Sequence, residues 1–334
     1  MINKLYSIII KIYGNEEKWK KSRLRKATHP IVVWGIANIK SSTFYMIYNR
    51  GLFYENATAR ICKRKPLKGI EKIIFLRDLF RITVPQLECN VGLVCTLRCQ
   101  KCNQCNYMLK DKHFFDVEMM IDNLQKIFNS VDYIHSVSIA GGEALGAPKI
   151  ERIINCIVSS EKVGSLVVVT NGTIFPTEEV FEALHHPRIE LSISNYPLVG
   201  EFRENRERLY LECEKRGINV NNNNEVDQWT DIGEPYNRKK TKLHEKNTYA
   251  NCWLKDVLTL IDGKVFRCEK IYILDKLGVR KMKTDDYIDV NKCNGKQLRK
   301  ALHRVYRIHT LDACNYCNSP EDRTIIPSGV QAED

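Results

Sequence analysis

The sequence predicts an α/β protein built around a parallel sheet, and three observations indicate this fold class. From residue 84 onwards, short apolar runs alternate with segments whose apolar residues recur every three or four positions. The run "SLVVVTNG" shows no polar alternation, which is typical of a strand covered on both faces. A chain of 334 residues, 43% hydrophobic and 28% charged, is long enough for one large core or two to three domains. Together these features predict about five strand–helix repeats.

The first predicted strand and helix flank a cysteine-rich loop. "VPQLECNVGLV" is mostly apolar with β-branched residues and predicts a strand that leads into this loop. In "FFDVEMMIDNLQKIFNSV", Asp116 is a candidate N-cap, and Met120, Leu124, Ile127 and Phe128 recur at helical spacing. We therefore expect an amphipathic helix directly after the loop.

The remaining repeats follow the same order. "HSVSIA" predicts a strand, and the isoleucines of "PKIERIINCIVSSEK" line one helical face. "SLVVVTNG" predicts the next strand, and "PTEEVFEALHH" a short helix capped by Thr177. "IELSISNYP" predicts a strand, "EFRENRERLYLECEKRG" a helix that ends at Gly217, and "INVNN" a further strand. The cysteine loop, "GGE", "TNG" and "SNY" all fall at the carboxyl ends of strands, where α/β sheets bind their ligands.

Charge and hydropathy restrict the function classes. The net charge is +12, and basic residues gather at 18–26, 60–65 and 238–246. These runs lack the interleaved aromatic residues of a nucleic-acid module, so nucleic acid is an unlikely partner, while an anionic partner remains open. The sequence has no run of about 18 apolar residues and no signal-peptide pattern. We therefore expect a cytoplasmic, reduced protein, whose thirteen cysteines are metal ligands or buried hydrophobes rather than disulfides.

The cysteine loop contains the most specific pattern of the chain. Cys95, Cys99 and Cys102 form C-x3-C-x2-C within "CTLRCQKCNQC". Three thiolates leave one iron of a cubane [4Fe–4S] cluster without a protein ligand, because full ligation takes four. Zinc prefers two well-separated ligand pairs, and a redox C-x-x-C does not need Cys95. The spacing favours a cluster with one iron free for an exogenous ligand.

These motifs resemble the radical S-adenosylmethionine (SAM) superfamily over residues 84 to about 222. The cysteine loop after the first strand resembles the superfamily signature, "GGEAL" its methionine-amine motif, and "TNG" and "SISN" its ribose and carboxylate contacts. Lys101 stands where most members have an aromatic residue beside the adenine. The resemblance implies a partial (β/α)6 radical SAM barrel, and it implies cofactor contacts at Lys101, Gly141, Gly142, Glu143, Thr170, Asn171, Ser192, Ser194 and Asn195.

The resemblance also implies a reaction. The free iron would chelate the amine and carboxylate of SAM, and one-electron reduction would release a 5′-deoxyadenosyl radical that abstracts a substrate hydrogen. The cofactor performs this chemistry, while the protein supplies orientation and a dry cavity. Glu143 would accept the methionine ammonium, and Gly141 and Gly142 would allow close backbone approach. The implied electron donor is a flavodoxin or a ferredoxin.

A second set of cysteines lies near the end of the sequence. "CWLKDVLTLIDGKVFRC" places Cys252 and Cys268 around a hairpin marked by "DG", and "LDACNYC" adds Cys314 and Cys317. The set resembles the auxiliary-cluster extension called SPASM, in its shortened twitch form, which implies one auxiliary [4Fe–4S] cluster bound by these four residues. A zinc ribbon uses two cysteine pairs as well and remains the alternative.

The expected organisation has three parts. Residues 1–82 form an N-terminal α/β extension in which "HPIVVWGIANIKSS" resembles a degenerate Rossmann turn at Gly35. Residues 83–247 form the radical SAM core, and residues 248–334 form the auxiliary domain. Four isolated cysteines are expected to be mostly small buried hydrophobes, namely Cys62, Cys89, Cys156 and Cys213.

Several functions remain open at the level of the sequence. An auxiliary cluster beside the radical site could accept an electron from the substrate radical, and the resemblance to twitch-type enzymes implies oxidation of a carbohydrate-like substrate. Epimerisation is the redox-neutral alternative, with Cys105, Cys213 or Cys293 returning a hydrogen atom. Maturation of a ribosomal peptide is a competing substrate class. A rival of another class is a zinc-stabilised binding module without catalytic activity.

Overall fold

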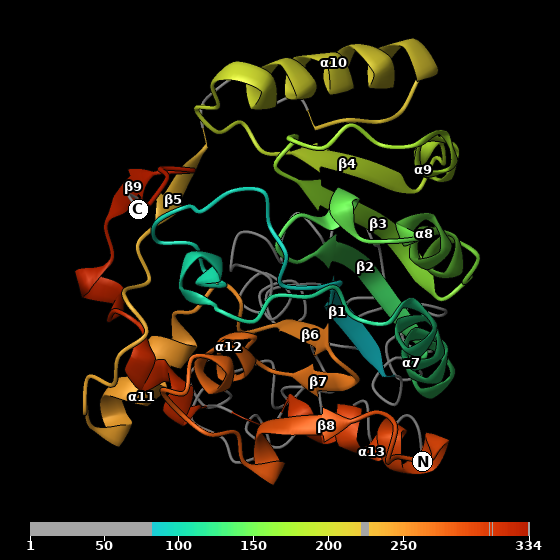
Figure 1. The fold of residues 1–334 in the computed structure, drawn as a ribbon. Helices are drawn as coiled ribbons and strands as arrows, with labels where there is room; N and C mark the ends of the chain where they lie inside the picture. Colours follow the sequence, from blue (N-terminus) through green and yellow to red (C-terminus); the bar gives the residue numbers. More distant parts are fainter. Residues whose placement is uncertain (1–81, 222–226, 307, 309, 333–334) are drawn as a thin grey trace, which may run out of the picture.

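The structure is a computed structural model that describes residues 82–221, 227–306, 308 and 310–332 (Figure 1). The expected N-terminal extension, with its glycine turn at Gly35, lies outside the described residues except for residue 82. The same holds for Cys62.

A seven-stranded sheet in the order β4-β3-β2-β1-β6-β7-β8 forms the centre of the described chain. Strands β1 to β4 are parallel, as the sequence predicts, and β6 is parallel to β1 on its other side. β7 and β8 continue the sheet in antiparallel pairing. The bounds are β1 Thr83–Asn90, β2 Tyr133–Ala140, β3 Val163–Thr170, β4 Ile189–Ile193, β6 Val257–Ile261, β7 Lys264–Phe266 and β8 Tyr287–Asp289.

The helices between the parallel strands occur where the periodicity predicts them. Figure 1 shows α7, α8 and α9 along one side of the sheet. The Asp116 side chain caps α7 by accepting a hydrogen bond from the backbone N–H of Met119 at 2.7 Å. Thr177 occupies the N-cap of α9 without a side-chain cap bond, and Gly217 ends α10 in a left-handed conformation. The bounds are α7 Val117–Ser130, α8 Ile150–Val158, α9 Glu178–Leu184 and α10 Gly200–Arg216.

One strand differs from its sequence pattern. β3 alternates between buried residues, such as Leu166 and Val168, and partly exposed ones, such as Val167 and Val169. The uninterrupted apolar run predicted burial on both faces. Val169 lines a cavity on the second face, so that face is open where the sequence alone indicated a covering layer.

The later part of the chain extends the same sheet. Asp262 and Gly263, both with positive φ, form the turn of the predicted hairpin between β6 and β7. Because β6 lies next to β1, the sheet crosses the expected boundary at residue 247, and the domain division stays a prediction. The predicted "INVNN" strand appears only as a parallel bridge from Val220 to Leu191. A separate two-stranded sheet pairs β5, Gln228–Thr230, with β9, Ile325–Pro327.

The remaining helices belong to this later part. An Asn294–Gln297 capping box begins α13, in which each side chain bonds the backbone N–H of the other residue. The bounds are α11 Lys242–Ala250, α12 Lys270–Lys276 and α13 Gly295–Val305. Short 3-10 turns occur in both the earlier and the later part, at Asn106–Met108, Ala144–Gly146, Thr284–Asp286, Asp312–Tyr316 and Pro320–Asp322. Among the described residues, no helix has the length and apolarity needed to cross a bilayer.

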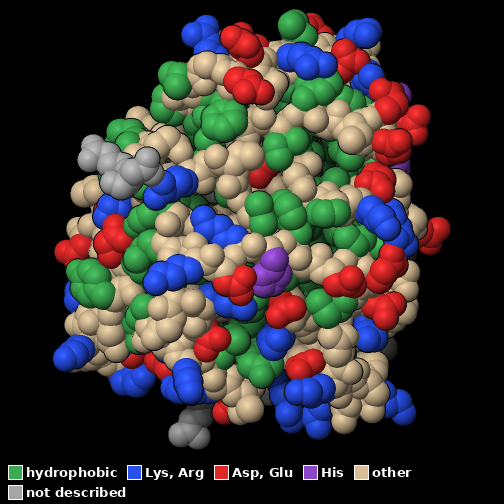
Figure 2. Space-filling view, in the orientation of Figure 1, with side chains coloured by type: hydrophobic (Ala, Val, Ile, Leu, Met, Phe, Trp, Pro, Cys, Tyr) green, Lys and Arg blue, Asp and Glu red, His purple; other side chains and the backbone are tan. Residues whose placement is uncertain are grey.

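Charged side chains are distributed over the surface. On the face shown in Figure 2, basic and acidic side chains are interspersed rather than gathered in one basic patch. Two lysines of the basic run at 238–246 have partners within the protein: Lys242 pairs with Glu245 at 2.7 Å, and Lys240 contacts Ser319 at 2.9 Å.

A buried histidine makes a pH dependence of stability expected. His135 on β2 is 5% exposed, and burial lowers its pKa from 6.5 to about 4. The unfolded chain binds a proton at this histidine more readily than the folded chain does. Protonation of His135 therefore lowers the free energy of unfolding little above pH 6.5 and by an increasing amount as the pH falls towards 4. At about 1.4 kcal/mol per pKa unit, the loss between pH 7 and pH 4 is about 3 kcal/mol. Urea denaturation across this range should show a shallower loss for His135→Phe than for the wild type. The exposed His113→Phe is the control, and parallel profiles for the wild type and His135→Phe would contradict the prediction.

Candidate active site

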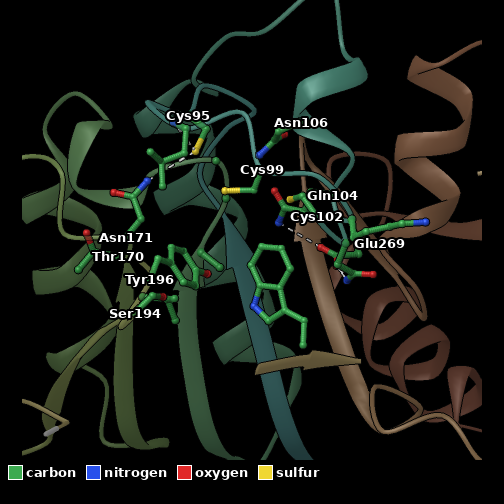
Figure 3. Close-up of a pocket in the computed structure, with 18 of the residues that line it drawn as sticks. Cys95, Cys99, Cys102, Gln104, Asn106, Thr170, Asn171, Ser194, Tyr196 and Glu269 are labelled. Atoms are coloured by element: carbon green, nitrogen blue, oxygen red, sulfur yellow. Dashed lines mark hydrogen bonds between the residues drawn. The ribbon is translucent and has the colours of Figure 1, made fainter. Parts of the chain in front are cut away.

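A cavity of about 470 Å³ lies at the carboxyl ends of the parallel strands. Its wall is formed by the loop after β1, by Ala140 at the end of β2, by Thr170 at the end of β3 and by Ser194 just after β4. The loops expected at this edge therefore meet around one space. Figure 3 shows Cys95, Asn171, Thr170, Ser194 and Tyr196 on one side of the cavity and Asn106, Gln104, Cys102 and Glu269 on the other, with Cys99 between them.

All three cysteines of the C-x3-C-x2-C motif line this cavity. The chain turns sharply within the loop, since Lys101 and Cys105 both have positive φ, at 58° and 50°. The backbone N–H of Leu97 lies 3.5 Å from the Cys95 sulfur. Burial is the largest cause that raises the pKa of the Cys95 thiol, to about 12, and burial also raises the pKa values of Cys99 and Cys102. The positive charge of bound iron would offset this cost of forming thiolates.

The two glycines of "GGE" let two backbone segments approach closely. The Gly142 N–H donates to the carbonyl of Gly92 at 2.9 Å, and the Glu143 N–H donates to the carbonyl of Val94 at 2.8 Å. A Cβ on Gly142 would lie 2.0 Å from the Val94 carbonyl oxygen. The close approach expected from the glycines is therefore present, and its immediate partner is the start of the cysteine loop.

Glu143 lies behind the cavity wall rather than in it. Its carboxylate is buried and accepts hydrogen bonds from the Thr170 hydroxyl at 2.6 Å, the Asn171 N–H at 2.7 Å and the Leu145 N–H at 3.0 Å. Burial raises the pKa of Glu143, and these hydrogen bonds act in the opposite direction. The carboxylate thus fixes the "TNG" turn against the "GGE" turn, and direct contact with an ammonium group stays a prediction.

Asn171 connects the "TNG" turn to the cysteine loop. Its side-chain NH₂ donates to the Thr96 hydroxyl at 3.1 Å and lies 3.7 Å from the Cys95 sulfur. Its side-chain oxygen accepts hydrogen bonds from the N–H and the hydroxyl of Thr173, at 2.9 and 2.7 Å. The amide orientation is thereby determined, with its donor side towards the cysteine loop.

The structure divides the other predicted residues into two groups. Lys101 and Ser194 line the cavity, whereas Ser192 and Asn195 do not. Ser192 pairs with Val169 inside the sheet, and the Asn195 N–H donates to the Asp227 carboxylate at 2.8 Å. Lys101 forms ion pairs with Glu234 at 2.8 Å and Asp231 at 3.5 Å, which tie the cysteine loop to the segment after β5.

Several cavity residues have no motif that would identify them in the sequence. Tyr196 and Trp229 meet edge to face with ring centroids 5.4 Å apart, and Trp253 is 65% exposed. Trp229 and Trp253 come from segments more than 120 residues after the cysteine loop, and their place at the cavity follows from the fold. For Tyr196, the sequence offered one signal: it belongs to "SNY", a loop predicted at the carboxyl end of a strand.

A pair of buried carboxyl groups lies beneath the cavity. Glu269 is 6% exposed and lines the cavity, where it accepts hydrogen bonds from the side-chain NH₂ groups of Asn103 and Gln104, the latter at 3.2 Å. Glu88 on β1 lies next to it, with its Oε1 atom buried. Burial, followed by the neighbouring Glu269, raises the pKa of Glu88 well above its ordinary value. Burial also raises the pKa of Glu269.

The four later cysteines are brought together behind the cavity. Burial is the largest cause that raises the pKa of Cys268, and the charges of Cys317, Cys252 and Cys314 raise this pKa further. Trp253 follows Cys252 in the sequence, and Glu269 follows Cys268. These two residues line the cavity, while the four cysteines themselves do not. The three thiols of the motif therefore face the cavity, and the four later thiols do not. Among the described residues, no three His, Cys, Asp or Glu side chains are placed to hold a single metal ion.

The remaining described cysteines lie outside the cavity wall. Cys89 and Cys213 are fully buried in the core, as expected, while Cys156 is partly exposed. Cys105 is 5% exposed and Cys293 is partly exposed, and neither lines the cavity.

Comparison with known proteins gives similarity only at the level of solved structures. Neither a family model nor a curated protein sequence matches the chain. BtrN in complex with S-adenosylmethionine and 2-DOIA shows 15% identity, covers 71% of this chain and 94% of its own, and has a TM-score of 0.47. The protein anSMEcpe with bound S-adenosylmethionine and the Cp18Cys peptide shows 13% identity, covers 68% of this chain and 84% of its own, and has a TM-score of 0.43. SuiB from Streptococcus suis bound to S-adenosylmethionine shows 14% identity, covers 80% of this chain and 83% of its own, and has a TM-score of 0.42.

The fold class itself follows from the strands of this chain. Parallel strands β1 to β4 follow one another in order, and helices α7, α8 and α9 connect them. The cysteine loop leaves the carboxyl end of β1 and lines the cavity at that edge. The described chain therefore has the α/β architecture, with a parallel sheet and a cysteine-lined cavity, that the sequence predicted as a partial radical SAM barrel.

Proposed function

We propose that this protein is a radical SAM enzyme that oxidises a carbohydrate-like small molecule. One observation carries the proposal: Cys95, Cys99 and Cys102 line the same cavity as Gly142 and Asn171. The sequence places these residues on three separate loops, and the parallel sheet brings them to one edge.

The residues present fit a [4Fe–4S] group with SAM. Three thiols on one bent loop at the cavity would supply three of the four iron ligands, which would leave one iron for an exogenous ligand. When bound, such a cluster supplies the electron that cleaves SAM and generates a carbon radical. The chain itself contributes the backbone of Gly141 and Gly142 at the wall and the Asn171 amide beside Cys95. A volume of about 470 Å³ is within the range of small-molecule sites.

The later four cysteines support an auxiliary cluster. Cys252, Cys268, Cys314 and Cys317 would saturate a second [4Fe–4S] group behind the wall formed by Trp253 and Glu269. This position suits an electron acceptor for the oxidation, in which the substrate loses a hydrogen atom, a proton and an electron. Among the described residues outside the three-cysteine motif, no cysteine lines the cavity, which disfavours epimerisation by thiol hydrogen return.

Metal analysis distinguishes the enzyme from a zinc-stabilised module. Protein reconstituted anaerobically with iron and sulfide is expected to bind about eight irons, four for each cubane. It should be brown, lose its colour in air, and form 5′-deoxyadenosine from SAM and a reductant. Zinc at both sites, with no iron uptake and an unchanged fold, would support the module.

The fate of substrate hydrogen tests the reaction type. Deuterium on the reacting carbon should appear in 5′-deoxyadenosine in both oxidation and epimerisation. Only epimerisation returns a solvent hydrogen to that carbon, so reactions in D₂O should give product without deuterium there. If solvent deuterium is found at the reacting carbon, the reaction is epimerisation rather than oxidation.

A further inference from the structure

A segment near the end of the sequence crosses the cavity loops and reaches the cysteine loop. We call residues 325–332 the strap. β9 of the strap pairs with β5, which places Ile326 opposite Trp229. At Gly329, a Cβ would lie 2.7 Å from the Tyr196 side chain, so the strap packs directly on a cavity residue. Figure 1 shows β5 and β9 beside the loop that follows β1.

The strap then pairs with the cysteine loop through its backbone. The Gln100 N–H donates to the carbonyl of Val330 at 2.7 Å, and the Ala332 N–H donates to the carbonyl of Arg98 at 2.7 Å. Cys99 and Gln331 form an antiparallel bridge between these bonds. A contact between residues 232 positions apart therefore holds the middle cysteine of the motif.

The side chain of Gln331 is oriented by its partners. Its oxygen accepts a hydrogen bond from the Arg98 N–H at 2.8 Å. Its NH₂ group must then point the other way, where it donates to the carbonyl of Gly329 at 2.6 Å and to the Cys99 sulfur at 3.3 Å. Cys99 is 8% exposed, so little water competes for this sulfur.

We propose that Gln331 is a positioning residue that orients Cys99 and sets the reduction potential of the cluster bound there. The proposal rests on the proposed function, because it assigns Cys99 as an iron ligand. Hydrogen bonds to ligand sulfurs are among the determinants of iron–sulfur potentials. A donor at the sulfur stabilises the negative charge that the cluster gains on reduction, so its loss makes reduction harder.

Three variants separate the sulfur contact from the backbone contact. Gln331→Glu keeps an acceptor for the Arg98 N–H but has no donor for the sulfur. Gln331→Met has neither group. Gln100→Met is the matched control, because the Gln100 side chain donates to the Gln331 carbonyl at 3.2 Å without contacting a cysteine sulfur.

The first measurement is the midpoint potential of the cluster whose EPR signal changes on addition of SAM. Gln331→Glu and Gln331→Met are expected to shift this potential to more negative values, while Gln100→Met leaves it unchanged. SAM cleavage by the two Gln331 variants should fall with flavodoxin as the donor and recover with the stronger reductant Ti(III) citrate. A purely structural role would leave Gln331→Met, which is uncharged like glutamine, at the potential of the wild type. Unchanged potentials in both variants at full iron content would overturn the proposal.

Amide hydrogen exchange of the metal-free protein tests the contact without a cluster. The Arg98 amide should be protected in the wild type and in Gln331→Glu, and it should exchange faster in Gln331→Met. Unchanged exchange at Arg98 in Gln331→Met would also overturn the proposal. If the wild type binds no iron, the proposed function fails, whereas this exchange experiment still decides whether Gln331 holds the loop.

Discussion

Replacement of Cys95, Cys99 and Cys102 by alanine is expected to remove about half of the bound iron and all formation of 5′-deoxyadenosine. The three thiols line one cavity, and no other described cysteine does so. Within the described residues, no further thiol therefore faces the cavity to substitute for them. Iron and sulfide analysis of the reconstituted variant, with chromatography of the reaction mixture, measures both effects.

The matched control is alanine at Cys156, which lies partly exposed on α8 and outside the cavity. This variant should keep the iron content and the product yield of the wild type. The complementary variant, with alanine at Cys252, Cys268, Cys314 and Cys317, should lose the other half of the iron. Product formation that persists in the first variant would refute the assignment of the cysteine motif.

Glu143→Leu is expected to have the largest effect of any single substitution outside the cysteines. It leaves the buried N–H groups of Leu145 and Asn171 without acceptors, and unpaired buried donors cost about 1–3 kcal/mol each. We expect a loss of about 3 kcal/mol in the free energy of unfolding, measured by urea denaturation of the metal-free protein. SAM cleavage should fall as well, because the carboxylate fixes both turns of the cavity wall.

Glu143→Gln separates the two functions that are open for this carboxyl group. An amide keeps one acceptor oxygen, so this variant should lose less stability than Glu143→Leu. If Glu143 only positions the turns, the Michaelis constant for SAM should follow stability across the two variants. A strong rise of that constant in Glu143→Gln at nearly normal stability would instead support direct contact with the methionine ammonium. Glu151→Gln, at the start of α8, is the control for removal of a carboxylate elsewhere.

Local patterns of the sequence determined the elements of the core. Apolar periodicity placed β1 to β4 and the helices between them, Asp116 marked the start of α7, and "DG" marked the β6–β7 turn. These signals are local, since side-chain periodicity and turn conformations depend on a few neighbouring residues. The edge at which the ligand loops meet was equally predictable, because parallel strands all end on the same side.

The partners of individual side chains were decided by the tertiary structure. Glu143 was predicted to accept the methionine ammonium, which stays a prediction, and in the structure three donors from two turns converge on its carboxylate behind the cavity wall. β6 belongs to the segment predicted as the auxiliary domain, a division that stays a prediction, and it extends the central sheet beside β1. Neither outcome has a local signal, because each depends on segments far apart in the sequence.

The sequence by itself determined that the ligand motifs follow successive strands, and the C-x3-C-x2-C spacing, with "GGE" and "TNG", supports the proposal of a cluster and its ligand. Only the tertiary structure added Trp229, Trp253, Glu269 and Gln331 to the site. The physical reason is that ligand spacing along one loop is set by local backbone geometry. The composition of a cavity wall and the donor on the Cys99 sulfur are set by contacts between segments more than a hundred residues apart.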